Sequence, residues 1–241
     1  MRLHERVFAL LTLLSAIGAM VASPAAWADA IDLKPFRATY TAEWKGMTAG
    51  TTILELRRAG TDLYSYSSTS NARGVFRMAF SETLTQTSTF RLQDGTVQPM
   101  TFRGVDEKER EINLNFDWTN LKVTGVAKDH PVDLALTAGA QDPMSLQISI
   151  LRNLTTGKVP PTVSMIDGDK LKDYELRLEG TARVETALGE LDTLIYTSKR
   201  ANADRVTRTW VAPALGYLPV KAERMRGKKV EFTLFIQSVD R

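Results

Sequence analysis

The chain has 241 residues, of which 43% are hydrophobic, and 31 lysines and arginines against 28 aspartates and glutamates give it a formal net charge of +3. So small a charge over this length excludes the dense basic footprint of a nucleic-acid-binding protein. The chain has no cysteine, which excludes disulfides, zinc–thiolate sites and a thiol nucleophile.

The first 28 residues have the pattern of a secretory signal peptide. Two arginines precede an apolar stretch at 7–22, and Ala26 and Ala28 form an Ala-x-Ala cleavage pattern. The apolar stretch is shorter than the ~20 residues that a membrane-spanning helix needs, so we expect cleavage and export to the periplasm. No later stretch is apolar enough to span a membrane, and residues 29–241 are expected to form a single β-rich domain.

Alternation of apolar and polar residues, which predicts half-buried strands, is nearly strict at 36–45, 111–118 and 230–237. It is typical of antiparallel sheets, because one face is buried and the other is solvated. Short turns such as Asp94-Gly95 should join neighbouring strands as hairpins. The remaining strands are expected at 51–58, 62–69, 82–92, 96–105, 120–127, 172–179, 181–187, 190–199, 205–212 and 217–226.

Two segments depart from the strand pattern. Residues 74–80 predict a helical turn or a bulged crossover. Asp142-Pro143 predicts the start of a longer helix over about 143–154, with Gly157 as its stop signal. The apolar residues of this helix cover more than half of its circumference, which is wider than the stripe of a helix on a flat sheet. We therefore predict a mainly β fold: a strongly curved antiparallel sheet, as a half-barrel or open barrel, with this helix in the concavity.

Residues suited to catalysis are few. His130 is the only histidine of the mature chain, it precedes Pro131 in an expected turn, and no Gly-x-Ser-x-Gly motif presents a serine. The segment Asp167-Gly168-Asp169 lacks the further ligands of a calcium loop and is interpreted as a turn. We expect no enzyme, no metal and no cofactor. A hydrolase with paired carboxylates is the least favoured alternative, because its candidates fall on the expected solvent face: Glu43, Glu55, Asp117 and Glu231.

Large apolar side chains on the alternating faces allow two interpretations. They form an ordinary core, in which each contributes roughly 1.5–3 kcal/mol on burial, or some of them line a cavity for an apolar ligand. The candidate lining residues are Tyr40, Trp44, Phe116, Trp118, Met144, Ile148, Leu151 and Trp210. The function we expect is a periplasmic, non-enzymatic binding or carrier module for an apolar or amphipathic ligand such as a lipid.

The alternative is a cell-envelope interaction protein with a solid core. Such a protein would bind an envelope protein partner through its strand edges or through a basic hairpin tip. That tip comprises Arg224, Arg226, Lys228 and Lys229, although such clusters also serve to keep an edge soluble.

Several segments resemble, in the same order, a pattern of exported bacterial proteins. A strand ending in Trp210 is followed by Leu218-Pro219-x-Lys221. The preceding segments are 188–193, 142–146 with Leu151-Arg152, and Tyr40-x-x-x-Trp44 with Gly46 and Gly50. Together, over about residues 34–239, they resemble the family of secreted proteobacterial proteins catalogued as domain of unknown function 3108.

That family has no established activity, so the resemblance implies export and supplies no catalytic residues. Residues 210–221 are also similar to the tail of periplasmic lipoprotein-carrier proteins, whose half-barrels hold acyl chains. This second resemblance implies a lipid ligand by analogy of fold. Many lipid-handling relatives are themselves lipidated on a cysteine, which this chain lacks.

Overall fold

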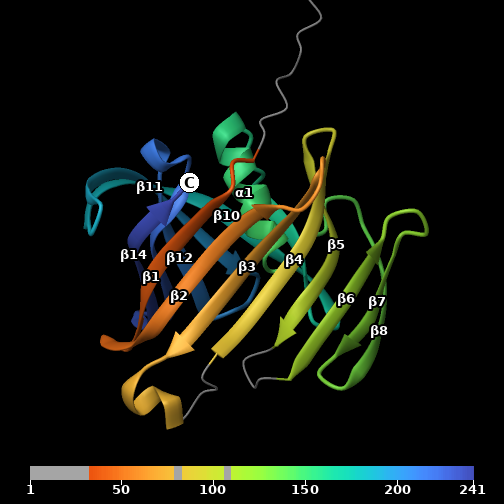
Figure 1. Ribbon diagram of the computed structural model, residues 1–241, viewed down its shortest axis with the longest axis horizontal. Helices are drawn as coiled ribbons and strands as arrows, with labels where there is room; N and C mark the ends of the chain where they lie inside the picture. The colour runs from red at the N-terminus through yellow and green to blue at the C-terminus, as the bar shows by residue number, and fades with distance from the viewer. Residues whose placement is uncertain (1–32, 79–82, 106–109) are drawn as a thin grey trace, which may run out of the picture. The chain divides into compact units, whose positions relative to one another are not determined.

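The computed structural model describes residues 33–78, 83–105 and 110–241. The expected signal peptide, residues 1–28, lies outside them. Most of the described chain forms one sheet of 14 strands (Figure 1). The strands are β1 (Phe36–Trp44), β2 (Met47–Arg58), β3 (Leu63–Ala72), β4 (Thr83–Gln93), β5 (Thr96–Val105), β6 (Glu111–Asp117), β7 (Lys122–Ala127), β8 (His130–Ala135), β9 (Thr162–Asp167), β10 (Lys170–Thr186), β11 (Gly189–Arg200), β12 (Arg205–Ala212), β13 (Leu218–Arg226) and β14 (Lys229–Asp240). The helices are η1 (Gly74–Met78), α1 (Ser145–Thr156) and η2 (Pro213–Leu215).

The sheet consists of two meanders. Its order is β8-β7-β6-β5-β4-β3-β2-β1-β14-β13-β12-β11-β10-β9, so that only β1 and β14 are neighbours without being consecutive. All of the strand pairs are antiparallel, as the alternation predicts. The edge strands β8 and β9 do not pair with each other. The predicted open, curved antiparallel sheet with one main helix is therefore confirmed.

The helix α1 lies against the concave side of the sheet and contacts β4 and β5 (Figure 1). Asp142 caps its start, because one carboxylate oxygen accepts the backbone N–H of Met144 at 2.7 Å and of Ser145 at 2.9 Å. The helix ends at Gly157, whose φ of 69° is left-handed. Both predicted helix signals, Asp142 and Gly157, therefore act as expected.

Aromatic rings fill the space between α1 and the strands opposite it. Tyr64 and Phe90 stack with their ring centroids 5.6 Å apart, and Phe36 meets Tyr66 at 6.0 Å. All four side chains are buried. No helix within the described residues is long and apolar enough to cross a membrane.

Two expectations about single segments need correction, and one strand was not expected. His130 was expected in a turn but is the exposed first residue of β8, an edge strand that tolerates Pro131 because such a strand has a neighbour on one side only. The second edge strand, β9, was not among the strands expected from the alternation pattern. The two strands expected at 172–179 and 181–187 are one long strand, β10, whose register with β11 shifts between Leu178 and Gly180.

Candidate functional site

The residues expected to line a cavity are mostly packed into the core. Their polar atoms are also satisfied internally: the Tyr40 hydroxyl donates to the Pro219 carbonyl at 2.9 Å, and the Trp118 indole N–H donates to the Pro99 carbonyl at 2.8 Å. Burial raises the pKa of Tyr40 far above its usual value. Trp44, Trp118 and Leu151 are half-buried. The exposed fractions of the other five are Tyr40 1%, Phe116 4%, Met144 1%, Ile148 1% and Trp210 8%.

Trp210 does not share a face of the sheet with Tyr40. Trp210 pairs with Lys221, which pairs with Phe235, which pairs with Thr41. Paired residues of an antiparallel ladder project to one side, and adjacent residues of a strand project to opposite sides. Trp210 therefore lies on the face of the sheet opposite to Tyr40.

On this second face a lysine lies between two aromatic rings. The Lys221 ammonium is 4.5 Å from the centroid of the Trp210 ring and 5.4 Å from that of Phe235. Ile195 pairs with Trp210 on the same side. Partly buried apolar side chains of the distal half of the β10–β11 hairpin pack against the hydrophobic core that includes Trp210. Trp210 is consequently covered by its own chain.

A first cleft, of about 350 Å³, lies where the tip of the β10–β11 hairpin meets β1 and β14. Two carboxylates, Glu43 and Glu185, line it together with Thr41, Thr186, Ala187, Val220, Phe235, Ile236 and Gln237. Glu185 is exposed at the hairpin tip. It therefore lacks the desolvated setting in which a carboxyl group becomes a general acid.

A second cleft, of about 310 Å³, lies beside α1, between the β4–β5 turn and the start of β9. Gln141 lines it and is 2% exposed. Its side-chain N–H₂ group donates to the carbonyls of Val97 at 2.9 Å and Gly139 at 3.3 Å, which fixes the orientation of the amide. Its amide oxygen then has no donor among the described residues.

Arg152 lines the same cleft from α1. Arg152 is 8% exposed as a whole residue, its guanidinium donates to the Gly95 carbonyl at 3.2 Å, and burial lowers the pKa of Arg152. No aspartate or glutamate lines this cleft. Its volume is near the lower limit of small-molecule sites, roughly 300 Å³, and its lining suits a small neutral or anionic polar group. No role was assigned to Gln141 or Arg152 from the sequence. An arginine within a mostly apolar helix was the one feature that pointed to a polar site there.

The expected basic tip is the turn between β13 and β14. Arg226, Lys228 and Lys229 are exposed there, whereas Arg224 is half-buried within β13. The described residues contain no cluster of three or more histidines or carboxylates that could hold a metal ion. The segment Asp167-Gly168-Asp169 is a turn, as expected.

Comparison with known proteins gives a family and a set of distant structural likenesses. The model of the family described as "Protein of unknown function (DUF3108)" matches residues 39–232. No curated protein matches the chain. The chain is similar to a chain of the Pseudomonas aeruginosa MucA/MucB complex, with 12% identity and a TM-score of 0.38, covering 86% of this chain and 51% of the other. It therefore spans about half of the length of that chain.

Two further solved structures are similar over most of both chains. One is a Bacteroides fragilis protein described as exported and YmcC-like in fold, with 10% identity, a TM-score of 0.39, and coverage of 87% and 97%. The other is described as a lipoprotein of Parabacteroides distasonis, with 7% identity, a TM-score of 0.37, and coverage of 86% and 96%.

Proposed function

The chain belongs to the family of proteins of unknown function designated DUF3108, and we propose that it is a non-enzymatic binding protein of the bacterial cell envelope that acts through its surface. The exported location rests on the signal-peptide pattern of residues 1–28. The proposal favours an interaction protein with a solid core over a carrier that encloses its ligand.

One observation carries the proposal: buried side chains occupy the space between α1 and the strands that it contacts, β4 and β5. Met144 and Ile148 are each 1% exposed, and Tyr64, Phe90 and Phe102 are buried opposite them. Interiors packed to this degree leave few voids larger than a water molecule. Neither cleft described above is lined by any of the eight residues expected to hold an apolar guest.

The absence of catalysis is part of the proposal. His130 is exposed at the start of an edge strand, and the sequence has no Gly-x-Ser-x-Gly motif that would present a serine to it. Of the two carboxylates in the first cleft, one is exposed. These observations favour a binding role, in which recognition depends on exposed side chains.

The test is native mass spectrometry of the protein purified from its own periplasm. We expect the bare mass of the chain, and the same thermal unfolding midpoint before and after the protein is unfolded, extracted with organic solvent and refolded. A lipid that stays bound through gel filtration, and whose extraction lowers the midpoint, would overturn the surface-acting role in favour of a carrier.

A further inference from the structure

Three segments meet at the end of the sheet opposite α1. They are the turn between β1 and β2 (44–48), the segment that contains η1 (73–78), and the turn between β13 and β14 (226–230); we call them the basic–apolar surface. The strands β3, β2, β1, β14 and β13 that carry them are consecutive neighbours. At about 4.8 Å between strands, the surface is roughly 20 Å wide.

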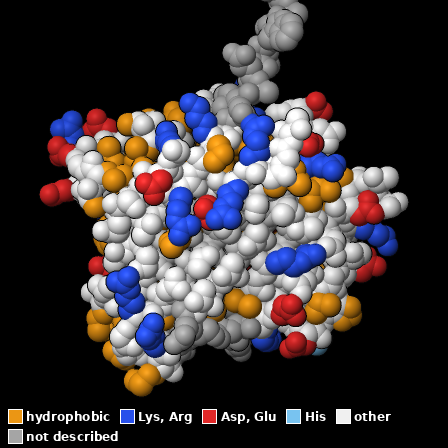
Figure 2. All heavy atoms as spheres, viewed as in Figure 1, with side chains coloured by type: hydrophobic (Ala, Val, Ile, Leu, Met, Phe, Trp, Pro, Cys, Tyr) orange, Lys and Arg blue, Asp and Glu red, His pale blue; other side chains and the backbone are white. Residues whose placement is uncertain are grey.

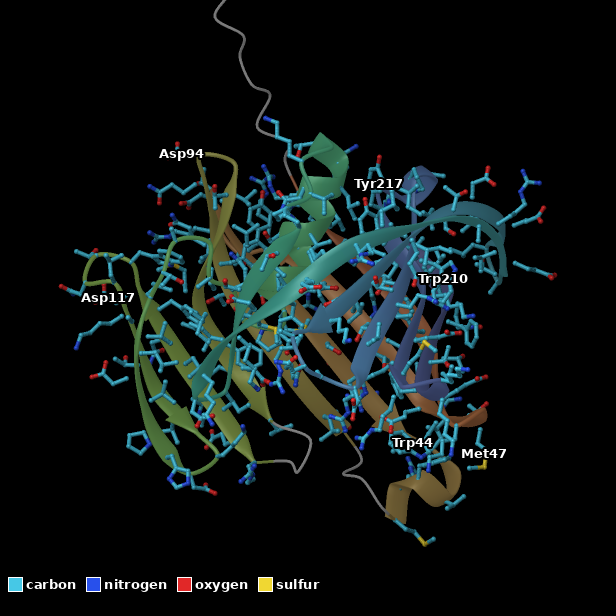
Figure 3. All side chains as sticks on the ribbon, turned by 180° about the vertical axis from the view of Figure 1, so that it is seen from behind. Trp44, Met47, Asp94, Asp117, Trp210 and Tyr217 are labelled. Atoms are coloured by element: carbon cyan, nitrogen blue, oxygen red, sulfur yellow. The ribbon has the colours of Figure 1, made fainter. Side chains whose placement is uncertain are left out.

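Backbone hydrogen bonds hold these segments to the strands beside them. The Arg73 N–H donates to the Ala49 carbonyl at 2.8 Å, next to the β1–β2 turn. The Lys45 N–H donates to the Glu231 carbonyl at 3.0 Å, next to the β13–β14 turn. Figure 3 shows Trp44 and Met47 close to η1. The three segments therefore form one continuous surface.

The three most exposed large apolar side chains of the described residues lie on this surface: Met78 at 86%, Val75 at 69% and Met47 at 58%. Val230, on the same surface, is 38% exposed. Trp44, which pairs with Met47 across the turn, is half-buried beside them. A group of exposed apolar side chains at one end of a protein indicates an interaction site.

Cations are interleaved with these apolar side chains. The three segments contain six lysines and arginines and no aspartate or glutamate: Lys45, Arg73, Arg77, Arg226, Lys228 and Lys229. The neighbouring Glu231 already pairs with Arg226 at 3.1 Å and lies 3.8 Å from Arg205. In Figure 2 orange and blue side chains gather together at the lower left, the end where η1 lies in Figure 1.

We propose that the basic–apolar surface docks the protein on an anionic lipid membrane, with η1 and the two turns at the level of the headgroups. The inference rests on the proposed function, because it names the partner of a surface-acting protein. Apolar side chains beside lysines and arginines are the composition that binds the interface of an anionic bilayer. The cores of protein–protein interfaces are depleted of lysine, and this surface has three lysines among its apolar side chains.

The test is co-sedimentation of the mature protein with vesicles of phosphatidylcholine alone and of phosphatidylcholine with phosphatidylglycerol. We expect binding to the anionic vesicles only, and weaker binding as salt is raised. A lysine near an anionic surface contributes about 1 kcal/mol, so the double variant Lys228→Gln/Lys229→Gln should bind roughly 30-fold more weakly. The variant Val75→Ser/Met78→Ser should also bind more weakly, at unchanged circular dichroism.

The matched control is Leu121→Ser/Lys122→Gln, in the β6–β7 turn at the other end of the strands. Leu121 is 57% exposed, close to the value for Met47, and a cation follows it. This control should bind as the wild-type protein does. Membrane docking would be overturned if the wild-type protein failed to bind anionic vesicles, or if the control and the test variants lost binding equally. It would also be overturned if a purified protein partner retained the protein and the vesicles did not. Such a result leaves the surface-acting role intact. That role is overturned only if native mass spectrometry finds a lipid that stays bound to the purified protein.

Discussion

The Asp142 carboxylate accepts a hydrogen bond of 2.5 Å from the Ser88 hydroxyl of β4, and neither side chain is exposed to solvent. The same carboxylate caps α1 through the N–H groups of Met144 and Ser145. One buried side chain therefore both starts the helix and fixes it to the wall of the sheet. Burial raises the pKa of Asp142, and the hydrogen bonds from Ser88 and the backbone oppose that rise in part.

The raised pKa predicts a pH dependence of stability. The folded protein retains the Asp142 proton to a higher pH than the unfolded chain does, so this contribution to stability is complete below the unfolded pKa and is lost as pH rises through the folded pKa. The free energy of unfolding of the wild-type protein minus that of Asp142→Asn should therefore fall as pH rises above 3.8, the ordinary aspartate value. Urea unfolding of both proteins at a series of pH values measures this difference. A difference that rises with pH would contradict the prediction.

Removing the hydroxyl partner should also destabilise the protein. Ser88→Ala leaves the buried carboxylate with one donor fewer, which costs about 1–3 kcal/mol of the free energy of unfolding. Because Ser88 and Asp142 are in contact, the double variant Ser88→Ala/Asp142→Asn should lose less than the sum of the two single losses. Urea unfolding of all four proteins measures the coupling. Strict additivity would show that the hydrogen bond contributes nothing.

Packing beside α1 makes a separate prediction. Ile148→Ala should lower the free energy of unfolding by about 2–5 kcal/mol, because the core around the residue cannot collapse fully into the space left. Val75→Ala, at a side chain that is 69% exposed, should change it by less than about 0.5 kcal/mol. Urea unfolding distinguishes the two. A small loss at Ile148 would indicate a loosely packed interior and would reopen the carrier interpretation.

Much of this architecture could be predicted because its determinants are local. Alternation locates β1, β6 and β14, since one side of each faces the core, and the capping residue and the left-handed glycine set the limits of α1. The edge strand β8 was not predicted, because Pro131 was interpreted as part of a turn. A strand with only one neighbour tolerates such a proline.

The candidate site depended on distant pairing and was less predictable. Tyr40 and Trp210 both belong to alternating strands, so the pattern alone assigned them to one interior. Their faces are set by the pairs that link Trp210 through Lys221 and Phe235 to β1, and no local pattern contains that register. The grouping of Met47, Val75 and Val230 at one end likewise follows from the neighbouring positions of β1, β2 and β14 in the sheet.

Two glycines with similar backbones allow backbone strain to be separated from steric contact. Gly125 in β7 has a φ of 146°, and Gly180 in β10 has a φ of 155°. A Cβ atom on Gly125 would lie 1.9 Å from the carbonyl oxygen of Asn113, whereas one on Gly180 would have no heavy atom within 4 Å. Alanine at either position is strained by the backbone alone.

Gly180→Ala should therefore lower the free energy of unfolding by about 1–3 kcal/mol, the cost of a rare backbone conformation. Gly125→Ala should cost several kcal/mol more or prevent folding, because relief of the contact requires β6 and β7 to separate where Leu114 pairs with Gly125. Urea unfolding and circular dichroism of both variants measure the difference. Equal losses would mean that β7 moves away from β6 at little cost, which the continuous ladder between these strands argues against.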